Sequence, residues 1–298
     1  MKSIFSFLII MAFACSWIRA QKPISVKEDS LSFGKEILPC LTVSIPEVNY
    51  ENTMKSWTKE IQSGTKSKVE KEGNEMTIFG AKINDISPNP VNVYSRMFSL
   101  DSMVKISVAF EMKKDQYIER NTNETDVDKA KTYLKNFAKE QYLELAKDQS
   151  DAEAKKLHDL QKEVSSLDRE KSRLQKLIES ATTIVFNEKQ NLTVQQNELN
   201  SVSDEMVGQN KELSSPDGDA VKKEKTDYIN SLEKRKKKAE SAIESSQDKI
   251  NKANTEIEKS NKEIPENDKK QQELNEKVHA QQAVAQKFEE KVKAIKAL

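Results

Sequence analysis

The densest run of charge in the sequence is Lys234-Arg235-Lys236-Lys237-Lys238. Adjacent cations attract anionic polymers and lipid surfaces. The run has no aromatic residue for stacking on bases, and the chain carries 49 Lys and Arg against 49 Asp and Glu. We therefore expect no nucleic-acid partner. A solvated helix face is the favoured interpretation, and a weak site for an anionic envelope lipid or polymer is the functional alternative.

Thiols and imidazoles are few and widely spaced: Cys15, Cys40, His158 and His279. If the first 20 residues are removed, Cys40 is the remaining thiol. Its options are burial as a small apolar residue or a disulfide between two copies of the chain. Both histidines fall at solvent-facing heptad positions, without a Cys or tight carboxylate cluster beside them. We therefore expect no metal site.

Carboxylates give no better signal for catalysis. Asp85, Asp101 and Glu111 are spread over the first third of the chain, and their surroundings are typical of turn and surface residues. A paired-carboxylate site needs two such groups held close together. With no nucleophile and base in a recognisable pattern and no cofactor motif, the sequence favours a protein that is not an enzyme.

Residues 1–20 have the organisation of a secretory signal peptide. Lys2 precedes an apolar run from Ile4 to Ile18, and Ala20 offers a small residue at the cleavage point. We therefore expect export to the periplasm or out of the cell. Two alternatives stay open: an uncleaved anchor, and a lipoprotein acylated on Cys15.

Residues 24–118 are expected to form a small α+β domain. A helix is predicted between an N-cap at Asn49 and a C′ glycine at Gly64, with Tyr50 and Trp57 on its core-facing side. The order β-α-β-β-β-β predicts an antiparallel sheet with one packed helix, buried on one face and wet on the other. The expected strands are 41–45, 66–71, 76–83, 91–99 and 103–112. Alternating apolar residues mark the first and the last, and the turn at 72–74 predicts a hairpin between the second and the third.

From Leu157 onwards, apolar residues follow the heptad pattern of a coiled coil. With Leu157 as position a, the frame runs to Met206, resumes at Ile229 and passes through Pro265, which should kink the helix without ending it. The intervening residues 214–219, Ser-Ser-Pro-Asp-Gly-Asp, predict a turn. Residues 125–298 are thus expected to form a long antiparallel α-helical coiled-coil hairpin, whose first turns pack on the small domain. The structural alternative is a parallel dimer of straight helices.

The turn also predicts which residues face each other. A turn centred between residues 215 and 216 places Leu167 opposite Ile264 and Glu188 opposite Ile243. Glu188 is then the poorest match in the apolar seam, because an ionised carboxylate is costly to bury without a partner.

These features favour an exported, non-enzymatic structural or interaction protein. Its small α+β domain would anchor or recognise something, and its hairpin would bridge to or bind a partner in the cell envelope. The alternative is a periplasmic holdase or adaptor, whose helical arms bind client proteins or join a larger helical assembly. A homo-oligomer through the coiled coil is also compatible with the pattern.

Overall fold

The computed structural model of the chain describes residues 24–119, 121, 124–213 and 219–298. The expected signal peptide, Cys15 and residues 214–218 of the expected turn lie outside these ranges. The chain divides into two compact units. The first runs to Lys156 and includes Gln282–Leu298, and the second is Leu157–Gln281.

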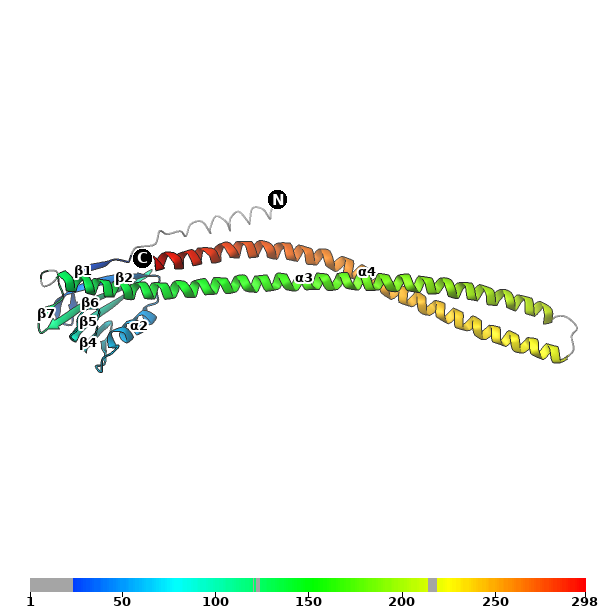
Figure 1. Cartoon of the computed structure of the whole chain (residues 1–298), viewed down its shortest axis with the longest axis horizontal. Helices are drawn as coiled ribbons and strands as arrows, with labels where there is room; N and C mark the ends of the chain where they lie inside the picture. Colours follow the sequence, from blue (N-terminus) through cyan, green and yellow to red (C-terminus); the bar gives the residue numbers. More distant parts are fainter. Residues whose placement is uncertain (1–23, 120, 122–123, 214–218) are drawn as a thin grey trace. The chain divides into compact units, whose positions relative to one another are not determined.

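The first unit contains an antiparallel sheet, for which seven strands are described (Figure 1). Their order is β1-β2-β6-β5-β4-β3, and β7 pairs with β6 outside this path. Every predicted strand overlaps an observed one, but β1 and β7 were not predicted. The bounds are β1 (Val26–Phe33), β2 (Glu36–Pro46), β3 (Glu70–Glu72), β4 (Glu75–Ala81), β5 (Val91–Leu100), β6 (Met103–Lys113) and β7 (Gln116–Tyr117).

Helix α2 (Tyr50–Gln62) has the predicted caps. The Asn49 side chain accepts a first-turn backbone N–H at 3.1 Å, and Gly64 follows the helix with φ 69°. Trp57 is fully buried, and its Nε1–H donates to Ser95 Oγ at 2.9 Å. The predicted core position of Trp57 is therefore confirmed.

Two long helices follow, α3 (Glu124–Leu213) and α4 (Asp219–Lys296), and α4 continues through Pro265. In the first unit, the start of α3 and the end of α4 both enter the core. Phe137 packs edge-on against Trp57 at 4.9 Å between ring centroids, and Ile295 is fully buried. The packing of the first helical turns on the small domain is thus confirmed.

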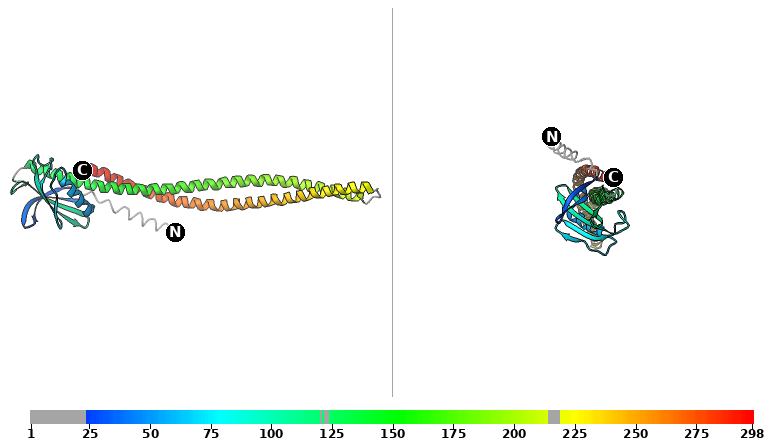
Figure 2. Two further views of the ribbon diagram at one scale, coloured as in Figure 1. Left: turned by 90° about the horizontal axis from the view of Figure 1, so that it is seen from below. Right: turned by 90° about the vertical axis from the view of Figure 1, so that its left-hand side faces the viewer.

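The second face of the sheet was predicted to be exposed to solvent, but it is only partly exposed. It holds a small cluster of its own, with Leu31, Tyr94 and Tyr117 packed around four buried residues: Phe33, Leu38, Cys40 and Ala109. The strands of the sheet are strongly curved (Figure 2). The turn between β1 and β2 is fastened to β4 and β5, where Gly34 N donates to Glu75 Oε2 at 3.1 Å and Arg96 Nη1 donates to Ser32 O at 3.0 Å.

In the second unit, α3 and α4 form the expected helical hairpin with a different register. Ser246 Oγ donates to Glu188 at 2.8 Å, and Asn267 Nδ2 donates to the backbone oxygen of Leu167 at 3.2 Å. Both partners lie three residues beyond the predicted ones. The observed register gives the Glu188 carboxylate a hydroxyl and an ammonium instead of Ile243, which removes the mismatch.

Candidate functional site

The seam of the hairpin unit contains a buried carboxylate at Glu188, which is 9% exposed. It accepts hydrogen bonds from Lys249 Nζ at 2.8 Å, Ser246 Oγ at 2.8 Å and Asn191 Nδ2 at 3.3 Å. The bonds from Lys249, Ser246 and Asn191, in that order, lower the pKa of Glu188 to about 2. Glu188 therefore stays ionised at neutral pH, and its carboxylate links α3 to α4 through Ser246 and Lys249.

A groove of about 460 Å³ begins beside this carboxylate, on one side of the hairpin unit. Most of the lining residues from α3 are apolar or small, and most of those from α4 are charged. The lining residues are Leu177, Ser180, Ala181, Ile184 and Glu188 on α3, and Lys249, Lys252, Ala253 and Glu256 on α4.

Leu177 and Ile184 are the two large apolar residues that line the groove. Each occupies a g position, directly before an a position. In two-stranded coiled coils, g positions usually carry Glu or Lys residues that pair across the helices. The same heptad position does hold such a pair nearer the end of the hairpin, where Arg235 Nη2 lies 2.8 Å from Glu198 Oε1. Apolar residues beside the a and d rows widen the apolar face, which is typical of a helix that packs on more than one neighbour.

The basic run surrounds its helix instead of forming one patch. Arg235 pairs with Glu198 and also lies 3.4 Å from Glu205, while Lys236 lies 4.0 Å from Glu240 within α4. The Glu198 hydrogen bond raises the pKa of Arg235. The other three cations of the run, all exposed, are Lys234, Lys237 and Lys238. The weak anionic-surface site stays a prediction, carried by these three lysines.

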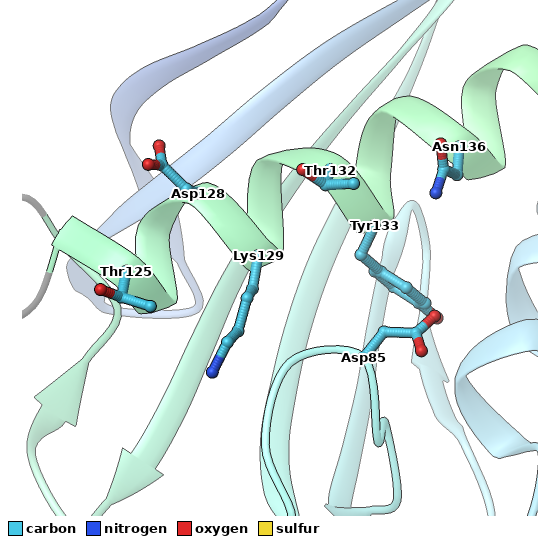
Figure 3. A pocket seen from close by; sticks show the side chains of 7 residues that line it. All are labelled: Asp85, Thr125, Asp128, Lys129, Thr132, Tyr133 and Asn136. Carbon is cyan, nitrogen blue, oxygen red and sulfur yellow. The ribbon is translucent and has the colours of Figure 1, made fainter.

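A second, more polar hollow of about 360 Å³ lies in the first unit (Figure 3). The early turns of α3 form one side of it, and the loop after β4 contributes Asp85. In Figure 3 the ends of the Asp85 and Tyr133 side chains lie together. The lining residues are Asp85, Thr125, Asp128, Lys129, Thr132, Tyr133 and Asn136.

Tyr133 lines this hollow, but its ring is packed in the hydrophobic core. Its ring lies 6.2 Å from that of Trp57 and 6.4 Å from that of Phe110. Burial, and then the charge and hydrogen bond of Glu60, raise the pKa of Tyr133. Its hydroxyl therefore stays protonated at neutral pH. The hollow has hydrogen-bonding groups for a small polar ligand but no described nucleophile with an adjacent base.

Glu111 is not the surface residue that the sequence suggested. It is 8% exposed and accepts from Asn92 Nδ2 at 2.8 Å, Asp115 N at 2.9 Å and the Tyr94 hydroxyl at 3.1 Å. Burial alone would raise the pKa of Glu111, but these three hydrogen bonds outweigh it and lower the pKa. Burial and Glu111 raise the pKa of Tyr94 to about 12. The network fastens β5, β6 and the turn before β7. Asp101 and Asp85 are exposed, as expected.

Cys40 lies in the small cluster on the second sheet face and is 3% exposed. Burial raises the pKa of its thiol to about 11, which disfavours the reactive thiolate. A disulfide between two copies stays a prediction, and it requires Cys40 to leave this packing.

His158 and His279 are both exposed. Within the described ranges, no group of three or more metal-ligating side chains occurs. In the same part of the chain, no helix is long and apolar enough to cross a membrane.

Comparison of the sequence with protein-family models and with curated proteins finds no match.

Sequence reasoning missed the groove although its signal was present. Leu177 and Ile184 are apolar residues seven apart, one position outside the a and d rows. The heptad assignment considers only the a and d positions, so it does not register these two apolar g positions. The α4 residues that line the groove depend on the register of the two helices, and the predicted register differs from the observed one by three residues.

Proposed function

We propose that the chain is an exported, non-enzymatic interaction protein of the cell envelope. Its α+β domain anchors or recognises one partner, and its coiled-coil hairpin bridges to or binds another. The groove beside Glu188 carries this proposal, because it presents apolar side chains where a self-contained two-helix coil would carry ion pairs. Ile184, at its rim, is 43% exposed.

The ionisable groups of the first unit support a binding role over catalysis. Glu111, Tyr133 and Tyr142 are buried and Tyr94 is half-buried, and burial and neighbouring groups hold each of them in one protonation state at neutral pH. A general acid or base works best with a pKa near the working pH. The polar hollow at Asp85 and Lys129 is the proposed recognition surface of the α+β domain.

One further observation favours the holdase or adaptor alternative. Large apolar side chains are exposed on α3 outside the groove: Phe186 is 61% exposed, Val194 61% and Val207 56%. Scattered apolar residues of this kind can contact unfolded clients without a defined register. Suppression of client aggregation that is lost on replacing these three residues with serine, and kept in groove variants, would favour the alternative.

Photo-crosslinking in cells tests the leading proposal. A photoreactive residue at Ser180, inside the groove, is expected to give a discrete protein adduct. The same residue at Lys176, which is exposed and outside the groove lining, is the matched control. Equal labelling at both positions, or none at Ser180, would count against a binding groove. Export is tested by the mass of the chain from the envelope fraction, which should begin at Gln21.

A further inference from the structure

We infer that the groove binds the same groove of a second copy of this chain, with the two hairpins antiparallel about a two-fold axis perpendicular to their helices. This inference rests on the proposed function, because it names the partner of the proposed binding surface.

Four residues at equivalent heptad positions mark the corners of the groove. Leu177 and Ile184 lie seven residues apart on α3, and Lys249 and Glu256 lie seven residues apart on α4. The register that puts Arg235 beside Glu198 puts Ile184 level with Lys249 two heptads further along. One heptad beyond that, Leu177 is level with Glu256. One pair of corners is thus apolar, and the other carries opposite charges.

This rectangle is complementary to itself under one operation. A two-fold axis through its centre, perpendicular to the helices, lays Ile184 on the partner subunit's Leu177 and Lys249 on the partner subunit's Glu256. Both contacts then occur twice, as in any isologous interface. Apolar surface meets apolar surface, and each cation meets an anion.

The other two-fold arrangement fails the same comparison. An axis parallel to the helices lays Leu177 on the partner subunit's Glu256 and Ile184 on the partner subunit's Lys249. Each charged group would then be desolvated by an aliphatic side chain without gaining a counter-ion, which costs free energy. The corner residues therefore select the antiparallel dimer.

The middle of the groove permits close approach of the two hairpins. Ser180, Ala181 and Ala253 have small side chains and lie between the corners. The Lys249 ammonium already binds Glu188 at 2.8 Å, yet its side chain is 55% exposed. An ammonium has three N–H donors, so Lys249 can keep its hydrogen bond to Glu188 and also donate to the carboxylate of the partner subunit's Glu256.

A charge-complementation experiment tests the dimer. Sedimentation equilibrium of the full chain over roughly 1 to 100 µM should show a dimer of twice the chain mass. Ile184→Glu and Leu177→Lys should each weaken self-association about tenfold or more. An equimolar mixture of these two variants should recover it. In the mixed dimer the new Glu meets the new Lys, and the second Leu177–Ile184 contact is intact.

Val194→Glu is the matched control, since Val194 is exposed on the same helix outside the groove. It should leave the dimer unchanged. The inference is overturned if the unaltered chain stays monomeric over this range. It is also overturned if Val194→Glu weakens the dimer as much as Ile184→Glu, or if the mixture associates no better than either variant alone. Self-association that fails while Ser180 still crosslinks to a different protein refutes the dimer but leaves the proposed function standing. Failure of both refutes both.

Discussion

Glu47 Oε2 and Lys291 Nζ lie 2.6 Å apart, although 244 residues separate them in the sequence. Lys291 also donates to Gln149 Oε1 at 2.9 Å and lies 5.3 Å from the centroid of the Tyr142 ring. The Tyr142 hydroxyl donates to Glu47 Oε1 at 3.2 Å. The cluster joins the end of β2 to α3 and α4 within the first unit.

This cluster makes the ionisation of Tyr142 a probe of the first unit. Burial, and then the charge and hydrogen bond of Glu47, raise the pKa of Tyr142 to about 12. Glu47→Gln removes the charge, so the pKa should fall towards the ordinary value of about 10. Phenolate absorbance, read as the difference from a Tyr142→Phe variant, measures it. Glu144→Gln, an exposed carboxylate on the same helix, should leave the titration unchanged.

The same shift predicts how stability depends on pH. The pKa of Tyr142 is higher in the folded chain than in the unfolded chain, so the neutral hydroxyl is what the fold stabilises. Its contribution is complete below pH ~10 and is lost as the pH rises towards 12. Tyr142→Phe should therefore weaken the alkaline dependence of the denaturant midpoint. An unchanged dependence would contradict this assignment.

Ile295, near the end of α4, is predicted to stabilise the α+β domain. Its side chain is fully buried in the core that also contains Trp57. Ile295→Ala removes methylene groups from a packed site and should cost about 2–5 kcal/mol of unfolding free energy. Trp57 fluorescence during denaturant unfolding reports on this core. Val292→Ala, at a partly buried position one turn earlier, should cost clearly less, and equal losses would argue against a specific role for Ile295.

Two serines of the seam should respond in opposite directions to the same change. Ser260 is fully buried, and its Oγ has no hydrogen-bond partner among the described residues, whereas Ser246 Oγ donates to Glu188. Ser260→Ala should stabilise the hairpin by about 1 kcal/mol, because a desolvated hydroxyl is removed. Ser246→Ala should destabilise it by a similar amount. Thermal unfolding followed by helix circular dichroism compares them, and a loss in Ser260→Ala would contradict the prediction.

Glu188 should make the hairpin sensitive to acid. Its pKa is lowered to about 2 in the folded chain, so its contribution is present above the unfolded value of about 4.3 and is lost as the pH falls towards 2. Glu188→Gln should lower the thermal midpoint at neutral pH and flatten its decline between these two values. Glu179→Gln, at an exposed position on α3, is the control and should keep the full decline.

Much of the small domain followed from local chemistry. Asn49 and Gly64 bound α2 because capping and a positive φ depend on residue type at one position. The edge strand β1 was not predicted because its sequence, VKEDSLSF, lacks alternation and most of its side chains are exposed. An edge strand is specified by its neighbour more than by its own pattern.

The register of the hairpin shows what local patterns leave undecided. Apolar spacing makes several alignments similar, and the observed one depends on where Glu188 finds Ser246 and Lys249, roughly 60 residues away. Which residues form the corners of the groove therefore also depends on the register. Leu177 and Ile184 were visible in the sequence, but their charged counterparts on α4 were identifiable only after the register was known.

The burial of Ile295 also sets an order of events during synthesis. The core that encloses Trp57 includes a side chain made after the whole hairpin, so this core is complete only once that segment has been synthesised. Until then its apolar surfaces are open to chaperones and proteases. A chain interrupted before the last turns of α4 would thus carry an incomplete core, with the apolar surface around Trp57 partly uncovered.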